Sequence, residues 1–492
     1  MSCSVPTYGF DFTHGVRGTI GRVIRRTITP GRVPSGTYSY YLNDMPLARA
    51  LGPSLTPFEA DAIDIAVGIY VSDRLGPRHD PGIFRLPGER WPRRMILRLP
   101  VRELGRWNAR AVREGYEWLL YAMTGDDWHL SFVSSQGRLT TRRSEIQSGL
   151  FPKLHHEDAA VILNSGGLDA ALGMVRLAQR PGAAPLVPVS VTTNSRAHEV
   201  QDRVVAALFG QLGVARVPQG VARVETHLHG VPKATQESTQ RARSILYLTV
   251  GAVVAMRLGG DAFAVAEHGV GAINLPYTAD QFGARTTKAV HPMVLAQFAE
   301  LISRAADRAI TIDNPLLWET KGEAIQSTPT ELLELAKETV SCQRFPWWEA
   351  RNACGICTNC FVRRASLRQA GMEKIDDTRR LDVDLTDPDA AWAKRDFVPL
   401  RAMRGQAAAI DHALAELDPW PALLGAYPDL ADVVSLSSIW GLAVSEVEAR
   451  LVRMYGSYVD EMAGLCATIA RPGWRLDRTP PDAIRSRLAP TA

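Results

Sequence analysis

The stretch that decides the fold is AAVILNSGGLDAALGM, residues 159–174. An apolar, β-prone run at 159–163 meets a small-residue turn at 165–167. Apolar residues then recur at helical spacing over 168–175. The pattern predicts a strand, a glycine turn and a helix. Free backbone N–H groups and the positive end of the helix would meet at that turn, which is a geometry that binds phosphate.

The predicted anion-binding loop consists of Ser165, Gly166, Gly167, Leu168 and Asp169. The two glycines let the backbone approach an anion closely and form a nest of N–H groups. Asp169, early in the helix, is an acid well placed to hold Mg²⁺ through its carboxylate. The alternative is an ordinary glycine turn between a strand and a helix.

The spacing of this loop matches neither G-x-x-x-x-G-K-[ST] nor G-x-G-x-x-G. It resembles the S-G-G-x-D-[ST] loop of the PP-loop ATP pyrophosphatases. That resemblance implies that ATP binds here and is cut between its α- and β-phosphates, with AMP passing to an oxygen. One departure is Ala170, where the family usually carries Ser, so one phosphate-binding hydroxyl is missing.

Four of the six cysteines fall within 342–360. They are Cys342, Cys354, Cys357 and Cys360, the last three as a double C-x-x-C with a shared middle cysteine. Four thiolates at this spacing predict a closed tetrahedral site for structural Zn²⁺. A disulfide and an iron–sulfur cluster are the alternatives. We find no pattern of a secretory signal in the first residues, and a cytoplasmic protein favours metal.

The two features together resemble the QueC family, the 7-cyano-7-deazaguanine synthases. The glycine turn is followed by Thr339-Val-Ser-Cys342, by the double C-x-x-C, and by Arg363. Glu319-Thr320-Lys321-Gly-Glu323 resembles the family's L-T-K-x-E, and Arg241 and Arg243 stand near the place of its P-x-R-N segment. The resemblance covers roughly residues 155–375.

The resemblance implies a reaction. The carboxylate of 7-carboxy-7-deazaguanine attacks the α-phosphate of ATP, pyrophosphate leaves, and an amine then displaces AMP. Residues 165–167 would cradle the pyrophosphate and Asp169 would hold Mg²⁺. Arg243 and Lys321 are the cationic candidates for phosphate or carboxylate, each with a solvated surface charge as its alternative. Catalysis of this kind is mostly positioning and charge neutralisation.

The deazaguanine ring needs a stacking surface and an acid for its amino edge. Glu267 follows a predicted strand and could supply the acid. The family's D-Y-S-G-Y segment is replaced by residues 271–277, which contain Asn274 and Tyr277. With Trp347 these complete the predicted substrate-binding residues, and core packing is the alternative for each aromatic.

Composition limits the function classes. The 492 residues suffice for two or three domains, and the formal net charge is +4 without a long Lys/Arg run. We therefore expect no nucleic acid as direct substrate. No apolar run reaches about 18 residues, so no membrane span is expected.

The chain is expected to form four parts. Residues 1–155 read as an α+β accessory domain, 156–313 as the PP-loop ATP-binding domain, 314–372 as the zinc element and 373–492 as a helical extension. Strand and helix alternate over 156–313, which predicts a doubly wound parallel α/β sheet. The expected strands are 159–164, 185–192, 214–218, 261–265 and 309–312. The expected helices are 168–180, 197–212, 242–258 and 291–307.

The added segments resemble the larger QueC-like proteins of bacterial anti-phage systems, such as QatC and the QueC-like component of type IV CBASS. This implies that the acyl acceptor is the N-terminal amine of a partner protein. The alternatives are a housekeeping 7-cyano-7-deazaguanine synthase that uses ammonia, a tRNA-modifying PP-loop enzyme, and a non-catalytic zinc-stabilised scaffold. A homodimer is left open.

Overall fold

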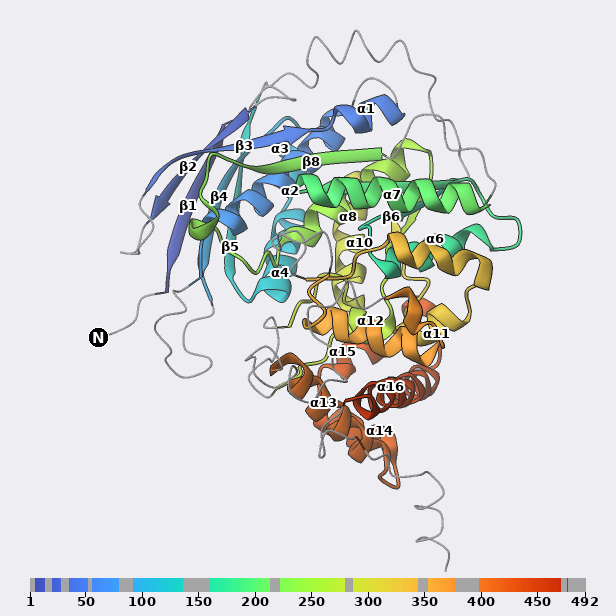
Figure 1. The fold of residues 1–492 in the computed structure, drawn as a ribbon. Helices are drawn as coiled ribbons and strands as arrows, with labels where there is room; N and C mark the ends of the chain where they lie inside the picture. Colours follow the sequence, from blue (N-terminus) through green and yellow to red (C-terminus); the bar gives the residue numbers. More distant parts are fainter. Residues whose placement is uncertain are drawn as a thin grey trace, which may run out of the picture. The chain divides into compact units, whose positions relative to one another are not determined.

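A computed structural model describes residues 5–13, 20–27, 35–51, 55–78, 92–135, 159–212, 222–278, 286–343, 353–376, 398–469 and residue 476. The chain divides into two compact units, coloured along the sequence in Figure 1. Unit 1 comprises Met1–Ser165, Arg176–Val265 and Gly283–Pro315. Unit 2 comprises Gly166–Val175, Ala266–Phe282 and Leu316–Ala492.

Unit 1 contains one ten-stranded sheet in the order β10-β9-β6-β7-β8-β3-β2-β1-β4-β5. The strands are β1 (Thr7–Thr13), β2 (Ile20–Thr27), β3 (Gly36–Asn43), β4 (Arg94–Val101), β5 (Asp127–Ser134), β6 (Ala160–Leu163), β7 (Leu186–Thr192), β8 (Ala222–His229), β9 (Ala262–Ala264) and β10 (Thr311–Asp313). Six neighbouring pairs are parallel and three are antiparallel, which confirms a mixed α/β fold with a mostly parallel sheet.

The parallel half, β6 to β10, lies where strand and helix alternate in the sequence. β7 is buried at every position, as expected of a parallel strand covered on both faces. The strand expected at 214–218 lies outside the described residues, and the strand at this place in the sheet is β8. It pairs with β7 from Val189↔Ala222 to Thr192↔Glu225.

The N-terminal segment extends the same sheet. β3 pairs antiparallel with β8 from Ser39↔His229 to Asn43↔Glu225, and β2 and β1 follow outward before β4 and β5. Residues 1–155 and 156–313, which composition separates, therefore both contribute strands to one sheet.

Seven helices among the described residues of unit 1 pack against strands of the sheet. They are α1 (Met45–Leu51), α2 (Pro57–Leu75), α3 (Leu104–Trp107), α4 (Arg110–Thr124), α7 (Ser195–Leu212), α8 (Arg243–Arg257) and α10 (Pro292–Ala306). α2 packs against α8 and β4, and α4 against α10. On β4, Met95, Leu97 and Leu99 are buried and alternate with exposed residues, so one side of that strand faces this core.

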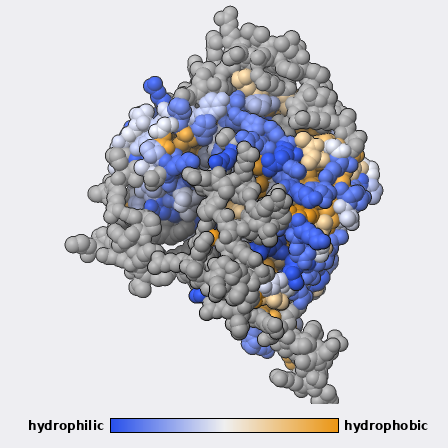
Figure 2. Space-filling model, in the orientation of Figure 1, coloured by the Kyte–Doolittle hydropathy of each residue, from blue (hydrophilic) through white to orange (hydrophobic). Residues whose placement is uncertain are grey.

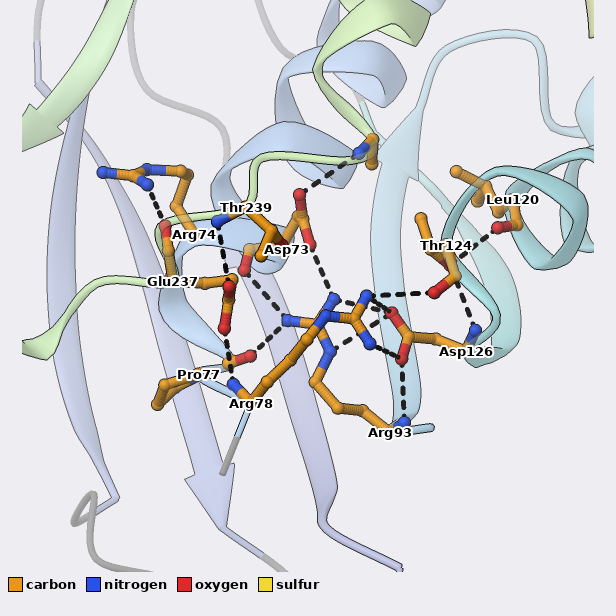
Figure 3. Close-up of polar contacts among 12 residues, drawn as sticks. Asp73, Arg74, Pro77, Arg78, Arg93, Leu120, Thr124, Asp126, Glu237 and Thr239 are labelled. Carbon is orange, nitrogen blue, oxygen red and sulfur yellow. Dashed lines mark hydrogen bonds and ion pairs between the residues drawn. The ribbon is translucent and has the colours of Figure 1, made fainter. Parts of the chain in front are cut away.

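A buried ionic network joins the N-terminal segment to the start of α8 (Figure 3). Arg93 is fully buried and donates to Asp73 Oδ1 and Asp126 Oδ2, each at 2.6 Å. The second oxygen of Asp73 accepts the backbone N–H of Ala242 at 3.2 Å. Guanidinium pairs of this kind are costly to break from one side, because a buried charge is then left without its partner.

Unit 2 is helical. Its elements are α9 (Gly269–Ile273), α11 (Lys321–Gln326), the 3₁₀ helix η3 (Thr330–Glu338), α12 (Thr358–Gln369), the 3₁₀ helix η4 (Glu373–Ile375), α13 (Val398–Leu414), α14 (Pro419–Ala426), α15 (Leu430–Val434), the 3₁₀ helix η7 (Ser437–Trp440) and α16 (Val444–Ala467). Helix α6 (Leu168–Ala178) begins in unit 2 and ends in unit 1. A single apolar core joins α9, α12, α13 and α16.

Among the described residues, no helix combines the length and the apolarity needed to cross a membrane. On the face drawn in Figure 2, hydrophilic areas of the described residues alternate with smaller hydrophobic ones.

Candidate functional site

The glycine turn has the local geometry that its sequence predicts. Gly166 has φ +78°, which a residue with a side chain rarely adopts. α6 starts two residues later with the buried Leu168. The carbonyl of Gly166 accepts the N–H of Val340 at 3.0 Å, which connects the turn to the segment before the first zinc-site cysteine. Ser165 is exposed and belongs to unit 1.

Asp169 is the centre of a buried charge cluster in unit 2. Lys321 Nζ lies 2.9 Å from Asp169 Oδ2, and His268 Nδ1 lies 2.9 Å from Asp169 Oδ1. The three residues are only 8%, 3% and 4% exposed, respectively. The structure thus joins Asp169 with Lys321, 152 residues apart in the chain, and adds a histidine to which the sequence analysis gave no role.

The opposite charges in this cluster shift one another's pKa values. Burial raises the pKa of Asp169, but the charges of Lys321 and His268 outweigh burial and keep that pKa well below its usual range. For His268, burial and Lys321 both lower the pKa, while the charge and hydrogen bonds of Asp169 and Glu267 raise it to about 9. His268 therefore carries its proton at neutral pH.

Glu267 and Tyr277, two of the predicted substrate residues, lie beside this cluster. Glu267 Oε1 is 2.9 Å from His268 Nδ1, and the Glu267 side chain is 31% exposed. Burial, and then the Glu267 charge, raise the pKa of Tyr277 to about 12, so the two side chains are near each other. Asn274 caps α9 with φ +50°, a backbone role. Trp347 lies outside the described residues.

Lys321 owes its place to a capping box at the start of α11. The Thr320 hydroxyl accepts the N–H of Glu323 at 3.2 Å, and Glu323 Oε2 accepts the N–H of Thr320 at 2.9 Å. This reciprocal cap explains the Thr-Lys-Gly-Glu pattern found in the sequence. It fixes the first residue of the helix, which is Lys321.

The four cysteines converge as predicted. Their Sγ atoms lie within 4.8 Å of one another and all four residues are buried. The Cys357–Cys360 sulfur separation is 3.4 Å and that of Cys354–Cys360 is 3.9 Å. Sulfurs 2.3 Å from a tetrahedral zinc stand about 3.8 Å apart, whereas a disulfide needs about 2.05 Å. The donor set therefore fits structural Zn²⁺.

Arg363, which the sequence analysis noted beside the cysteines, supports this site. It is 4% exposed and donates to the Thr339 hydroxyl at 2.7 Å and to the Ala336 carbonyl at 2.8 Å. Its Nε lies 3.0 Å from Asp376. The arginine thus holds the segment that leads into Cys342.

Arg243, the other predicted catalytic cation, lies in unit 1. Its guanidinium donates to Gln240 Oε1 at 3.3 Å and stands 5.5 Å from the ring of Tyr247. Nearby Arg241 is half-buried, and burial, then the charge of Arg78, lowers its pKa to about 10. Gln240 and Tyr247 both belong to unit 1, so the role of Arg243 in the reaction stays a prediction.

The residues around Asp169 can also be tested against Mg²⁺. Ligand atoms of Asp169, Glu267 and His268 lie within 4.8 Å of one another. The carboxylates suit Mg²⁺, but a protonated His268 does not, and Lys321 already holds one Asp169 oxygen. Two negative and two positive side chains leave no excess negative charge for a metal alone. The set fits Mg²⁺ when nucleotide phosphates supply further oxygens.

Comparison with known families covers the segment that contains these features. Residues 159–371 match the family model described as queuosine biosynthesis protein QueC. The matched segment is QueC-like. It carries the glycine turn, Asp169, His268, Lys321 and the four cysteines, and it supports a PP-loop enzyme that uses ATP. The QueC-like segment ends before α13, so α13 to α16 lie outside it.

Proposed function

We propose that this chain is an ATP-dependent ligase that adenylates 7-carboxy-7-deazaguanine and transfers the acyl group to an amine. The observation that carries the proposal is the buried Asp169–His268–Lys321 cluster directly after a Ser-Gly-Gly turn, within a QueC-like segment. Two fixed cations beside an anion-binding turn suit a reaction in which negative charge gathers on a departing pyrophosphate.

Each step balances without a nucleophile from the protein. A substrate carboxylate oxygen bonds to the α-phosphorus as the bond to the β-phosphate oxygen breaks, and pyrophosphate leaves. The amine nitrogen then bonds to the acyl carbon, AMP leaves, and the amine loses its proton. Residues 165–167 would hold the phosphates, and Lys321 would neutralise developing charge. Mg²⁺ bound with ATP would supply further charge neutralisation, with Asp169 and Glu267 as its protein ligands.

We propose that the acceptor amine is the N-terminus of a partner protein, in an anti-phage defence system. The added elements support this part of the proposal. β1 to β5 and α13 to α16 all lie outside the QueC-like segment. Ammonia needs no docking surface, whereas a polypeptide acceptor needs interface area.

The first test is pyrophosphate release from ATP with 7-carboxy-7-deazaguanine. Release that depends on this acid supports the ligase, and no release with any carboxylic acid would support a scaffold. The second test is intact-mass analysis of proteins co-expressed from neighbouring genes. A mass gain equal to the acylated deazaguanine at an N-terminus is expected. Conversion of the acid and ammonia to free nitrile, with no adduct, would instead indicate the housekeeping synthase.

A further inference from the structure

The carboxylate of Glu461, outside the QueC-like segment, contacts the turn that carries Lys321. Glu461 belongs to α16, and it is only 4% exposed. An isolated buried carboxylate is costly, so its position calls for hydrogen-bond donors around it.

Three donors meet Glu461, and two of them flank Lys321. Glu461 Oε1 accepts the hydroxyl of Thr320 and, at 3.1 Å, the backbone N–H of Gly322. Glu461 Oε2 accepts the hydroxyl of Ser366, on α12, at 2.7 Å. The residues immediately before and after the catalytic lysine are therefore both tied to one side chain.

Glu461 and Gly322 are closely packed against each other. A Cβ atom on Gly322 would lie 2.4 Å from Glu461 Oε1, so only glycine at 322 permits this approach. One turn earlier on the same face of α16, the Ser457 hydroxyl donates to Glu323 Oε1 at 2.8 Å. A second close approach lies one turn further back, where a Cβ atom on Gly269 would meet Met454 Sδ at 2.3 Å. α16 thus contacts both the turn of Lys321 and the helix that follows His268.

We propose that Glu461 is a positioning residue that holds the Lys321 ammonium on Asp169. The proposal rests on the proposed function for the importance of Lys321 in the reaction. It assigns α16 a part in the site itself. Replacing a residue that orients a metal ligand typically changes activity about 10- to 100-fold, and we expect an effect of the same size for a residue that orients Lys321.

The test compares Glu461→Gln with Glu446→Gln. The second variant makes the same change on the same helix, at an exposed glutamate whose partner is Arg450. Two readouts are measured: kcat and KM for ATP in pyrophosphate release, and the labelling of Lys321 by acetic anhydride, followed by peptide mass spectrometry. Labelling of Lys288, a buried lysine of unit 1, reports any general loss of structure.

We expect Glu461→Gln to lower kcat about 10- to 100-fold with little change in KM, and to speed labelling of Lys321 but not of Lys288. Glu446→Gln should match the unaltered protein in both readouts. Gly322→Ala places a methyl group against the Glu461 carboxylate and should reproduce the Glu461→Gln result. If Glu461→Gln does not fold, Gly322→Ala decides the question.

Unchanged kcat and unchanged Lys321 labelling in a folded variant would overturn the proposal. So would equal acceleration at Lys321 and Lys288, because that result indicates loosening of the whole protein. If the unaltered protein releases no pyrophosphate with any acid, the proposed function fails, and the labelling comparison still decides whether Glu461 positions Lys321.

Discussion

The two units each bury an ionic cluster, but with different chemistry. In unit 1 the fully buried Arg93 is bound by Asp73 and Asp126 through a planar guanidinium that cannot lose its proton. In unit 2 Asp169 is bound by a lysine ammonium and an imidazole, which reorient and exchange protons more readily. The first cluster suits a permanent join between chain segments, and the second suits a place where ligand phosphates take over part of the pairing.

Two buried histidines repeat this contrast. His268 lies between two carboxylates, which raise its pKa to about 9 against the effect of burial and of Lys321. His291 caps α10 in unit 1, since its Nδ1 accepts the N–H of Met293 at 3.2 Å. Burial, and then Lys288, lower its pKa to about 3. Burial acts in the same direction on both, so the neighbouring charges decide which histidine is protonated.

The largest effect should come from the metal. Closed cysteine sites contribute folding free energy directly, so Cys357→Ser or exhaustive chelation should unfold unit 2 and leave poorly soluble protein. About one zinc per chain is expected by elemental analysis. Metal-free protein with unchanged activity and thermal unfolding would contradict the Cys₄ assignment.

Arg93→Ala should have the next largest effect, at about 3–5 kcal/mol of unfolding free energy. Asp73 would stay buried without its guanidinium partner, and Asp126 would keep Arg78, at 2.6 Å. Denaturant unfolding measures this. The matched control is its neighbour Arg94→Ala, since Arg94 pairs with Asp127 on the surface, at 2.7 Å with side chains 54% and 46% exposed. A loss below about 1 kcal/mol for Arg93→Ala would mean that the network is not a structural join.

Asp169→Asn removes the charge at the centre of the cluster in unit 2. We expect pyrophosphate release to fall about 10²- to 10³-fold, as when a fixed electrostatic group is removed from a phosphoryl or acyl transfer site. Thermal unfolding should move less than with Arg93→Ala, because the amide of similar size can still accept a hydrogen bond from Lys321, and Glu267 still pairs with His268. Full activity in this variant would remove Asp169 from the proposed mechanism.

The smallest predicted effect is a pH dependence of stability through His291. Its pKa in the folded protein lies below the ordinary value, so the unfolded chain binds the proton more tightly. The stability is therefore full above about pH 6.5 and declines as pH falls, by about 2 kcal/mol at pH 5. His291→Asn keeps a side-chain cap and removes the titration. An unaltered pH profile of unfolding in that variant would show that His291 is not responsible.

Much of the fold can be predicted from the sequence, because apolar residues recur at the regular spacing of strands and helices. The strands at 160–163 and 186–192 and the helices α8 and α10 lie within a few residues of their expected bounds. β2 was not predicted, because Arg22, Arg25 and Arg26 interrupt its apolar run. Arg25 is nonetheless buried, since it donates to the Leu75 carbonyl at 2.8 Å. The Leu75 carbonyl, 50 residues away in the chain, satisfies this arginine only in the folded protein.

The candidate site likewise contains residues that local sequence patterns predict and residues that only the fold brings together. The glycine turn and the cysteine cluster are local patterns, and the sequence places them. His268 carries no motif of its own, and its role depends on two carboxylates that fold around it. Glu461 is one acid among several on a long amphipathic helix, and nothing in its spacing distinguishes it. Its partners Thr320, Gly322 and Ser366 stand 141, 139 and 95 residues earlier in the chain, respectively.

The assembly of unit 2 from three separate stretches of chain has a consequence for the order of events during synthesis. The ribosome makes Asp169 early, His268 and Lys321 later, and α16 after all of them. Pairing of segments so far apart is slow, because long loops must close first. A nascent chain that has emerged only as far as Lys321 lacks the helix that carries Glu461. The turn that carries Lys321 therefore gains its Glu461 partner only after α16, the last helix among the described residues, has been made.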